Sequence, residues 1–267
     1  MRDLHDLLIA GRMLGGSGAD EPVLITKNIT ANGTYSAASD NADGYSAVTV
    51  AVPELPVTFV KGIKSVGNSV IITDFVPAYD WITIADIKMG DIITASGGVS
   101  YILGAGYAPS GVTTGLYTVS LRNAGTNGMI FAVYSGNAYG DSGGFEISTY
   151  NADVIAARNT LVMRRGNAGN QFGAVSVINS TTATRTDVRT SLAIGGLHTF
   201  NPDENILIYN TREITFYGVK FCDNTGVTLH DLVPAKSKNT NRAGLYDLVT
   251  GKFYPSSSDY DDFITEV

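Results

Sequence analysis

Cysteine and histidine are scarce in this chain, and their scarcity excludes several kinds of site. Cys222 is the only cysteine in 267 residues, so the chain can form no internal disulfide and no zinc site from several thiolates. The histidines are His5, His198 and His230, too few to suggest a histidine-rich metal centre. We therefore expect neither a metal nor a cofactor.

Charge is also scarce, and what there is leans acidic. Charged residues make up 16% of the chain, whereas they are about a quarter of an average soluble domain. The 18 Lys and Arg against 25 Asp and Glu give a formal net charge of -7. A nucleic-acid-binding protein needs a basic face to neutralise phosphates. No run of Lys or Arg supplies one here, so we expect no nucleic-acid partner.

Long hydrophobic runs are missing as well. A membrane-spanning helix needs about 20 mostly apolar residues, and no run in this chain approaches that length. At the N-terminus, Leu7–Ala10 is apolar, but Asp3 and Asp6 precede it and Arg12 follows it. This stretch is too short for the apolar region of a signal peptide. We expect neither membrane insertion nor a secretory signal.

Glycine and tyrosine, by contrast, are plentiful, with 30 and 14 residues. Short apolar runs recur between Gly, Asn, Asp and Pro, and no convincing amphipathic helix lies among them. Many short strands without a βαβ alternation predict an all-β protein, here an antiparallel β-sandwich of the jelly-roll type over residues 57–267. The expected strands are Val57–Val66, Ser69–Val76, Trp81–Lys88, Asp91–Thr94, Leu116–Arg122, Met129–Tyr134, Phe145–Tyr150, Leu161–Arg164, Ala174–Ile178, Asn205–Tyr209, Glu213–Phe221 and Val227–Val233.

Residues 1–20 read as a short helix followed by a glycine-rich linker. Apolar side chains at helical spacing form the expected stripe, namely Leu4, Leu7, Leu8 and Leu14. A helix of this length is not stable alone in water. It would pack on its own sandwich, on further copies of itself or on a neighbouring protein. The linker Gly15–Gly18 favours the last two, so we expect this segment to anchor or oligomerise the chain, with a homotrimer as the expected assembly.

Residues 21–56 read as a small β module. Asn32-Gly33 is a strong hairpin signal between Val23–Thr30 and Thr34–Ser36. Two kinds of side chain then alternate along residues 45–52, as expected of a third strand. Pro53 and Pro56 mark the end of the module. So few strands are marginally stable alone.

Within this module Ile29–Ala37 reads ITANGTYSA and Asp43–Val50 reads DGYSAVTV. These two stretches resemble a short unit found in tail and baseplate proteins of phages that infect Gram-positive gut bacteria. The resemblance implies a virion protein that is assembled in the host cytoplasm. Such a protein leaves the cell by lysis, which agrees with the expected lack of a secretory signal.

The C-terminal part contains two motifs, LHDLVPA at Leu229–Ala235 and GLYDLVTGKFY at Gly244–Tyr254. They resemble the ending of the concanavalin-like, laminin-G-like lectin sandwiches, and Ile63–Asp74 resembles that family's opening strand pair more weakly. His230 replaces the family's arginine, and Val70 replaces an aromatic residue. The motifs imply structural roles, with Pro234 stopping a strand and Thr250-Gly251 forming a turn. The middle of the domain agrees only by strand order, with Ile102–Ala105 and Asn205–Tyr209 in plausible places.

Catalytic chemistry finds little support in the sequence. Gly140–Gly144 reads GDSGG, as around the nucleophile of trypsin-like proteases, but only His5 precedes Ser142, so we interpret the string as a tight turn. We expect His198 and His230 to be packed or hydrogen-bonded rather than general bases. No spacing pairs two carboxylates as a glycoside hydrolase requires. The acidic stretch Asp259–Asp262 could hold calcium, although a solvated tail accounts for it more simply.

Tyrosine-bearing loops are the best candidates for binding. Sugar sites combine flat aromatic faces with amide and carboxylate groups, and exposed tyrosines among Gly, Ser and Asn also form protein-binding surfaces. Two segments have this composition, Tyr101–Pro109 and Tyr134–Asp141. The candidate ligand-binding residues are Tyr107, Tyr134, Asn137, Tyr139 and Asp141. The alternative is that these tyrosines pack along the sheet edges.

Together these features favour a non-enzymatic phage tail protein: a fibre, receptor-binding or baseplate component. Its lectin-like sandwich would attach to the host surface, with a glycan or a protein as receptor. Other tail proteins would hold its N-terminal segment. Two alternatives stay open, a virion decoration or baseplate scaffold protein without receptor contact, and a cell-wall polysaccharide depolymerase.

Overall fold

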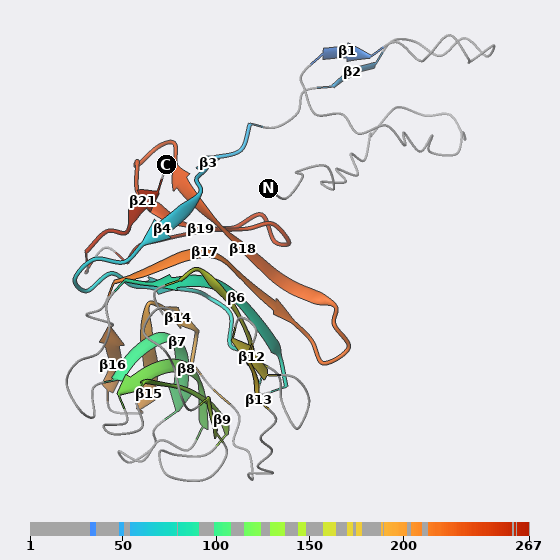
Figure 1. Cartoon of the computed structure of the whole chain (residues 1–267). Helices are drawn as coiled ribbons and strands as arrows, with labels where there is room; N and C mark the ends of the chain where they lie inside the picture. The colour runs from blue at the N-terminus through green and yellow to red at the C-terminus, as the bar shows by residue number, and fades with distance from the viewer. Residues whose placement is uncertain are drawn as a thin grey trace. The chain divides into compact units, whose positions relative to one another are not determined.

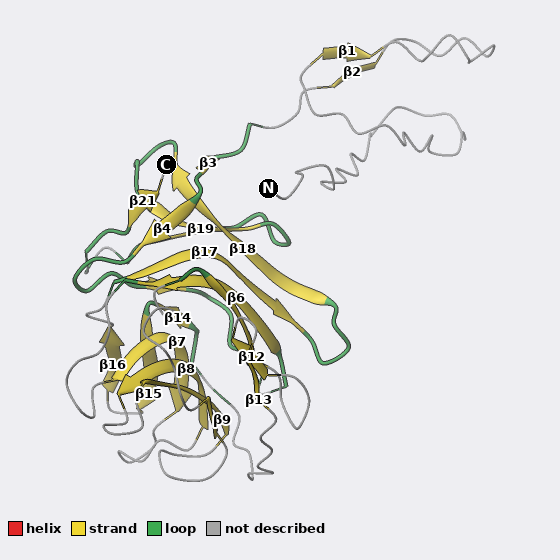
Figure 2. Ribbon diagram, in the orientation of Figure 1, coloured by secondary structure: helices red, strands yellow, loops and turns green. Residues whose placement is uncertain are grey.

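In the computed structural model the chain divides into two compact units, Met1–Leu55 and Pro56–Val267. The structure describes residues 33–35, 48–50, 54–78, 80–90, 99–107, 115–123, 129–136, 144–147, 157–163, 170–172, 175–177, 188, 190–201, 204–209, 213–257, 259 and 261–266. Every regular element among them is a strand (Figure 2). The all-β class expected from the strand pattern is therefore confirmed.

The first unit contains one described strand pair. β1 (Gly33–Tyr35) runs antiparallel to β2 (Val48–Val50), with Thr34 opposite Thr49. Both strands fall where the sequence predicts them. The expected pairing of residues 23–30 with 34–36 lies outside the described residues, as does the helix expected over residues 1–20.

The described strands of the second unit form two sheets. The larger has eleven strands, eight of which form its main path. From one edge to the other, these are β13 (Val175–Val177), β12 (Asn170–Phe172), β11 (Asn159–Met163), β6 (Ile82–Met89), β17 (Ile214–Cys222), β18 (Thr228–Ser237), β19 (Ala243–Asp247) and β20 (Phe253–Pro255). Beside this path, β3 (Val57–Phe59) pairs with β18, and β4 (Gly62–Lys64) pairs with both β17 and β21 (Ile264–Glu266). Figure 1 shows this sheet curving over the second one.

The smaller sheet has eight strands. Its main order is β10 (Gly144–Ile147), β9 (Met129–Gly136), β8 (Gly115–Asn123), β7 (Val99–Tyr107), β14 (Ala193–Ile194) and β5 (Ile71–Ile72). β15 (Gly196–Asn201) pairs with β7 and with β16 (Glu204–Tyr209). Among the described pairs only β7 and β15 are parallel, so this sheet is mixed, a detail that the strand pattern did not predict.

A sharp reversal at Gly195 produces that parallel pair. Gly195 has φ +82°, a backbone conformation that is strained for residues with a side chain. Its N–H donates a hydrogen bond to the Ile102 carbonyl at 2.8 Å. The chain thus pairs with β7 antiparallel before Gly195 and parallel after it. A Cβ at this position would meet the Ser69 carbonyl oxygen at 2.9 Å, so glycine also fits the lack of space.

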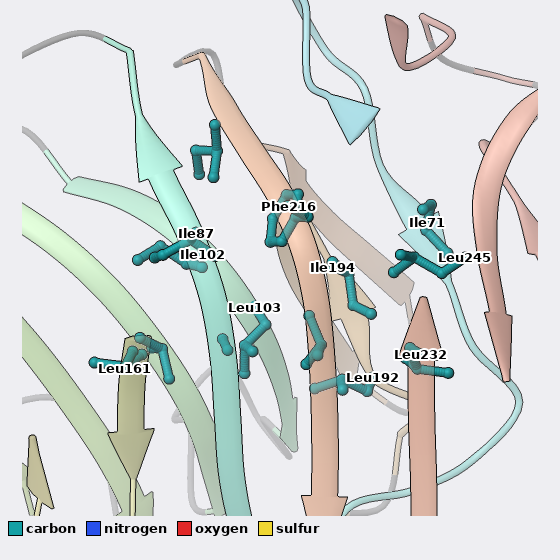
Figure 3. Packing of buried hydrophobic residues seen from close by; sticks show 14 of the residues in the cluster. Ile71, Ile87, Ile102, Leu103, Leu161, Leu192, Ile194, Phe216, Leu232 and Leu245 are labelled. Atoms are coloured by element: carbon teal, nitrogen blue, oxygen red, sulfur yellow. The ribbon is translucent and has the colours of Figure 1, made fainter. Parts of the chain in front are cut away.

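The core lies between the two sheets (Figure 3). β6 shows why: Ala85, Ile87 and Met89 alternate with more exposed residues, so one face of the strand is buried. From the facing sheet, Tyr117 and Val119 on β8 enter the same core. The Tyr117 and Thr83 hydroxyls bond each other across it, and burial raises the pKa of Tyr117, which keeps the phenol protonated. The two sheets therefore pack through apolar side chains, and the Thr83–Tyr117 pair adds a polar contact between them.

Pro234 does not stop a strand as the sequence suggested, since β18 continues to Ser237. The Pro234 carbonyl accepts from the Val60 N–H at 3.1 Å. In an extended strand the nitrogen and carbonyl of one residue point to the same side. The missing N–H of Pro234 therefore faces the place where the partner of β18 changes from β17 to β3, and no ladder bond is lost.

The acidic C-terminal stretch is not a free solvated tail either. Asp262 accepts two bonds from Arg242, at 2.9 and 2.6 Å, and Asp261 accepts from the Asn68 N–H at 2.9 Å. Phe263 is buried in the core between them and β21. The expectation of a solvated tail overlooked Phe263, the one aromatic residue in this stretch after Tyr260.

Candidate functional site

The two tyrosine-bearing segments, expected as loops, begin within strands: Tyr101–Tyr107 belongs to β7, with Tyr101 buried, and Tyr134–Gly136 belongs to β9. Both strands end at the same edge of one sheet. Tyr107, the last residue of β7, lies opposite Gly115, the first residue of β8. The next residue, Leu116, lies opposite Gly136, the last residue of β9. The chain therefore departs from β7 and from β9 at strand ends that only β8 separates, about 10 Å apart at the usual strand spacing.

Three more strand ends meet this edge. β15 runs parallel to β7 with Phe200 opposite Tyr107, so it also ends there, and β16 starts opposite its last residue. β10 starts there too, because Gly144 lies opposite Tyr134. The ends of β7, β9 and β15 and the starts of β8, β10 and β16 therefore lie at one edge of the eight-stranded sheet. We call this the loop edge.

The predicted binding residues are distributed unevenly around the loop edge. Tyr134 and Tyr107 belong to the described backbone of β9 and β7. In the strand register Tyr107 lies opposite Gly115 and Tyr134 lies opposite Thr118. Asn137, Tyr139 and Asp141 lie outside the described residues, as does the Ser142 of the protease-like string.

The outer face of the eight-stranded sheet, meaning the face turned away from the core, carries a row of mostly small residues. Cross-strand register aligns Ile72, Ala193, Gly104, Thr118, Tyr134 and Gly144 from β5 to β10. Tyr101 and Leu197 form a small apolar cluster on this face, apart from the main core. Leu197 occupies the space above Gly104, where a Cβ would meet its Cδ1 at 2.7 Å.

The larger sheet presents a different outer face. Arg158 donates to both carboxylate oxygens of Asp86, at 2.9 and 2.6 Å, and its guanidinium carbon lies 3.9 Å from the ring centre of Tyr217. The hydrogen bond with Asp86 raises the pKa of Arg158 further. Lys220 pairs with Asp231 at 2.8 Å on the same face. This face is charged and solvated, unlike the uncharged row on the smaller sheet.

Asp247 organises the turn that ends β19. Its carboxylate is fully buried and accepts four hydrogen bonds, from His230 Nδ1 at 2.8 Å, the Asp231 N–H at 3.0 Å, the Val249 N–H at 3.0 Å and the Thr250 hydroxyl at 2.8 Å. Burial alone would raise the pKa of this carboxyl, but the hydrogen bonds, led by His230, outweigh it and lower the pKa to about 2.

This pKa predicts a pH dependence of stability. Because the folded pKa of Asp247 lies below the ordinary value of 3.8, its contribution is complete above about pH 4 and is lost as the pH falls towards 2. The contribution is roughly 2 kcal/mol. The free energy of unfolding, measured in urea between pH 2 and 6, should differ less between the wild type and Asp247→Asn below pH 4 than above it. A difference that stays constant over this range would contradict the lowered pKa of Asp247.

His230 is packed as well as hydrogen-bonded. Its ring stacks on Phe75 with centroids 3.9 Å apart and planes at 14°, and Trp81 and Phe221 lie at 5.7 and 6.5 Å. His198 is held similarly, with its Nδ1 within 3.1 Å of the Thr190 hydroxyl and of the Ser191 carbonyl oxygen. The structure therefore gives both histidines the packed, hydrogen-bonded surroundings expected of them.

The connection between β5 and β6, which follows Ile72 and precedes Ile82, contacts this network. We call it the strap. Asp74 accepts from Lys252 and, at 2.5 Å, from the Tyr254 hydroxyl, and these bonds lower its pKa. At the other end of the strap, Asn224 donates to Asp80 at 3.2 Å. Lys252 and Tyr254 of the C-terminal motif, together with His230 stacked on Phe75, thus hold a connection between the two sheets. The sequence assigned the motifs a structural role but did not predict their partners in the strap.

Within the described residues, no three His, Cys, Asp or Glu side chains gather as a metal site would require. The described part of the chain also has no helix with the length and hydrophobicity to cross a bilayer. The leucines expected to anchor or oligomerise the chain, Leu4, Leu7, Leu8 and Leu14, lie outside the described residues. Comparison of the chain with protein-family models, curated proteins and solved structures gives no match.

Proposed function

We propose that the chain is a phage tail protein that binds the host surface through its β-sandwich, with a cell-wall glycan as the ligand. The observation that carries the binding half is the loop edge, where β7 ends at Tyr107 and β9 continues into the Tyr- and Asn-bearing sequence 134–141, with only β8 between the two strands. Loops grouped on a rigid scaffold are a common place for binding residues. The phage half rests on the resemblance of residues 29–50 to a tail and baseplate module.

The buried polar residues elsewhere in the sandwich stabilise the fold rather than form a catalytic site in this proposal. The histidines are held in packed hydrogen-bond networks, and the Asp247 carboxylate is saturated with four donors. Such a carboxylate has little capacity left to act as a general base, because its pKa is far below neutral pH. We therefore assign Asp247 and His230 to holding the sandwich together and the loop edge to binding.

The test is a binding assay with the intact protein on an array of cell-wall polysaccharides from Gram-positive bacteria. Tyr139→Ala and Asn137→Ala should each lower the affinity at least tenfold, about 1.4 kcal/mol, because each removes a predicted contact from the loop edge. Tyr217→Ala is the matched control. Tyr217 lies on the outer face of the other sheet, against Arg158, so its loss should leave binding unchanged.

Fluorescence of Trp81, the only tryptophan, reports whether each variant is folded, because its ring lies 6.0 Å from Phe221 in the core. Absence of binding to every polysaccharide and to host cells would overturn the receptor-binding proposal and favour a scaffold protein. Release of reducing ends from cell walls, abolished by mutating a carboxylate, would instead establish a depolymerase.

A further inference from the structure

The ring of His198 is held through one nitrogen only. Its Nδ1 lies 3.1 Å from the Ser191 carbonyl oxygen, 3.1 Å from the Thr190 hydroxyl and 3.2 Å from the Ser191 hydroxyl. A carbonyl oxygen can only accept a hydrogen bond, so Nδ1 carries the hydrogen and donates it. In the neutral ring Nε2 then has a lone pair and no hydrogen, which makes this nitrogen an acceptor.

The Nε2 atom of His198 is accessible to solvent. Every hydrogen bond that this ring forms with the described residues goes to Nδ1. An enclosed Nε2 would therefore be a buried polar atom without a partner, and in the described part of the chain the Thr118 hydroxyl oxygen is the only such side-chain atom. His198 and Ser191 are both partly exposed. The structure thus presents an acceptor nitrogen to solvent from a ring whose orientation is fixed.

His198 lies close to the loop edge. β15 runs parallel to β7, with His198 opposite Ala105 and Phe200 opposite Tyr107, the residue at which β7 reaches that edge. Two residues of extended strand span about 7 Å. A polymer bound at the loop edge is therefore within reach of the exposed Nε2.

The groups at this position match a sugar hydroxyl, which both donates and accepts hydrogen bonds. Nε2 can accept from such a hydroxyl, and the Ser191 hydroxyl can donate to it or accept from it. The bonds at Nδ1 fix the ring before a ligand arrives, so little side-chain freedom is lost on binding. His230 differs, because its ring stacks on Phe75 and its Nδ1 bonds the buried Asp247 carboxylate.

We propose that His198 is a contact residue for the bound glycan, with Nε2 accepting a hydrogen bond from a sugar hydroxyl and the Ser191 hydroxyl bonding the same sugar. This proposal rests on the proposed function, because the loop edge is what brings the polymer to β15. It adds a polar contact on a strand, next to the edge, to the tyrosines and amides predicted for the segments beyond the strand ends.

His198→Asn tests this contact. The asparagine amide can take the place of Nδ1 as a donor to the Ser191 carbonyl, whereas nothing takes the place of Nε2. The variant should melt near the wild-type temperature and bind the polysaccharide that the wild type recognises at least tenfold more weakly. The matched control is His230→Asn. It loses the stacking on Phe75, so it should melt at a lower temperature and bind with unchanged affinity.

A second measurement requires no variant of the contact residue. Long-range ¹⁵N–¹H correlation spectra of the wild type distinguish the protonated from the unprotonated ring nitrogen of each histidine. The free protein should show a protonated Nδ1 and an unprotonated Nε2 at His198. Addition of the polysaccharide should shift the Nε2 resonance of His198 and leave the ring resonances of His230 in place.

The outcomes separate the contact from the function on which it rests. Glycan binding by the wild type with an unmoved Nε2 resonance would overturn the contact alone, whatever the affinity of His198→Asn. Wild-type affinity in His198→Asn would do the same, and so would a proton on Nε2 in the free protein, since that nitrogen could then not accept. Failure of the wild type to bind any glycan would overturn the proposed function and the contact together.

Discussion

Replacing Asp247 by alanine should destabilise the sandwich by about 3–5 kcal/mol. Four donors lose their acceptor at once, among them His230 and the hydroxyl of Thr250. His230 would also lose the partner that fixes its ring against Phe75, and with it the strap between the two sheets. The measurement is urea unfolding at pH 7, followed by Trp81 fluorescence, since Trp81 lies 5.7 Å from the His230 ring.

Asp262→Ala is the appropriate comparison for this loss. Asp262 also accepts two bonds, from Arg242, but 55% of its side chain is exposed. Exposed ion pairs contribute about 0–1 kcal/mol, so this variant should unfold close to the wild-type urea concentration. If the two alanine variants lost equal stability, the special role of the buried Asp247 carboxylate would be wrong.

Gly244→Ala should be nearly as damaging, for a steric reason. Gly244 lies in β19 opposite Pro255 of β20. A Cβ there would meet the Tyr254 carbonyl oxygen at 2.2 Å and Pro255 Cα at 2.8 Å. Since both are backbone atoms, relief requires β20 to move away from β19. We expect a loss of roughly 3 kcal/mol or failure to fold, because overpacking of a well-packed interior typically costs about 1–3 kcal/mol or occasionally more.

The matched variant for this site is Gly218→Ala in β17. A Cβ at Gly218 would have the Leu232 carbonyl oxygen as its nearest neighbour, at 3.6 Å, an ordinary contact. This variant should therefore keep wild-type stability within about 0.5 kcal/mol. Thermal melts of both variants decide the matter, and a Gly244→Ala protein as stable as Gly218→Ala would show that β20 can shift at no cost.

The predictable part of the fold is the part governed by local pattern. Alternation in Trp81–Lys88 predicted β6 to within one residue at each end, because one face of this strand is buried and the other is wet. Thr250-Gly251 forms the expected turn, with Gly251 at φ +72°. β7 was not among the expected strands, and Tyr101–Pro109 was expected as a loop, because Gly104 and Gly106 weaken the local strand pattern. In the structure Leu197 packs over Gly104.

What sequence reasoning missed depends on contacts between distant residues. Nothing local to Gly195 indicates that the chain will reverse along β7 and continue in parallel. Nor does the sequence around Asp247 indicate that its carboxylate will form a hydrogen bond with His230, which lies on another strand. The sheet face of Thr118 could have been predicted, because alternation in Leu116–Arg122 places Thr118 and Ser120 together on the face opposite Tyr117. The missing information was that this hydroxyl would find no partner.

The order of pairing in the larger sheet has a consequence for how the chain folds during synthesis. β3 and β4 begin the sandwich, yet their partners are β17, β18 and β21 at its far end. About 150 residues or more must therefore emerge from the ribosome before either strand finds its neighbour, and closing such long loops slows folding. At synthesis rates of about 5–20 residues per second, the first strands wait on the order of ten seconds or more with their edges unpaired. The sandwich is thus completed only late in synthesis or after release, and its early strands are the segments that a chaperone would need to shield.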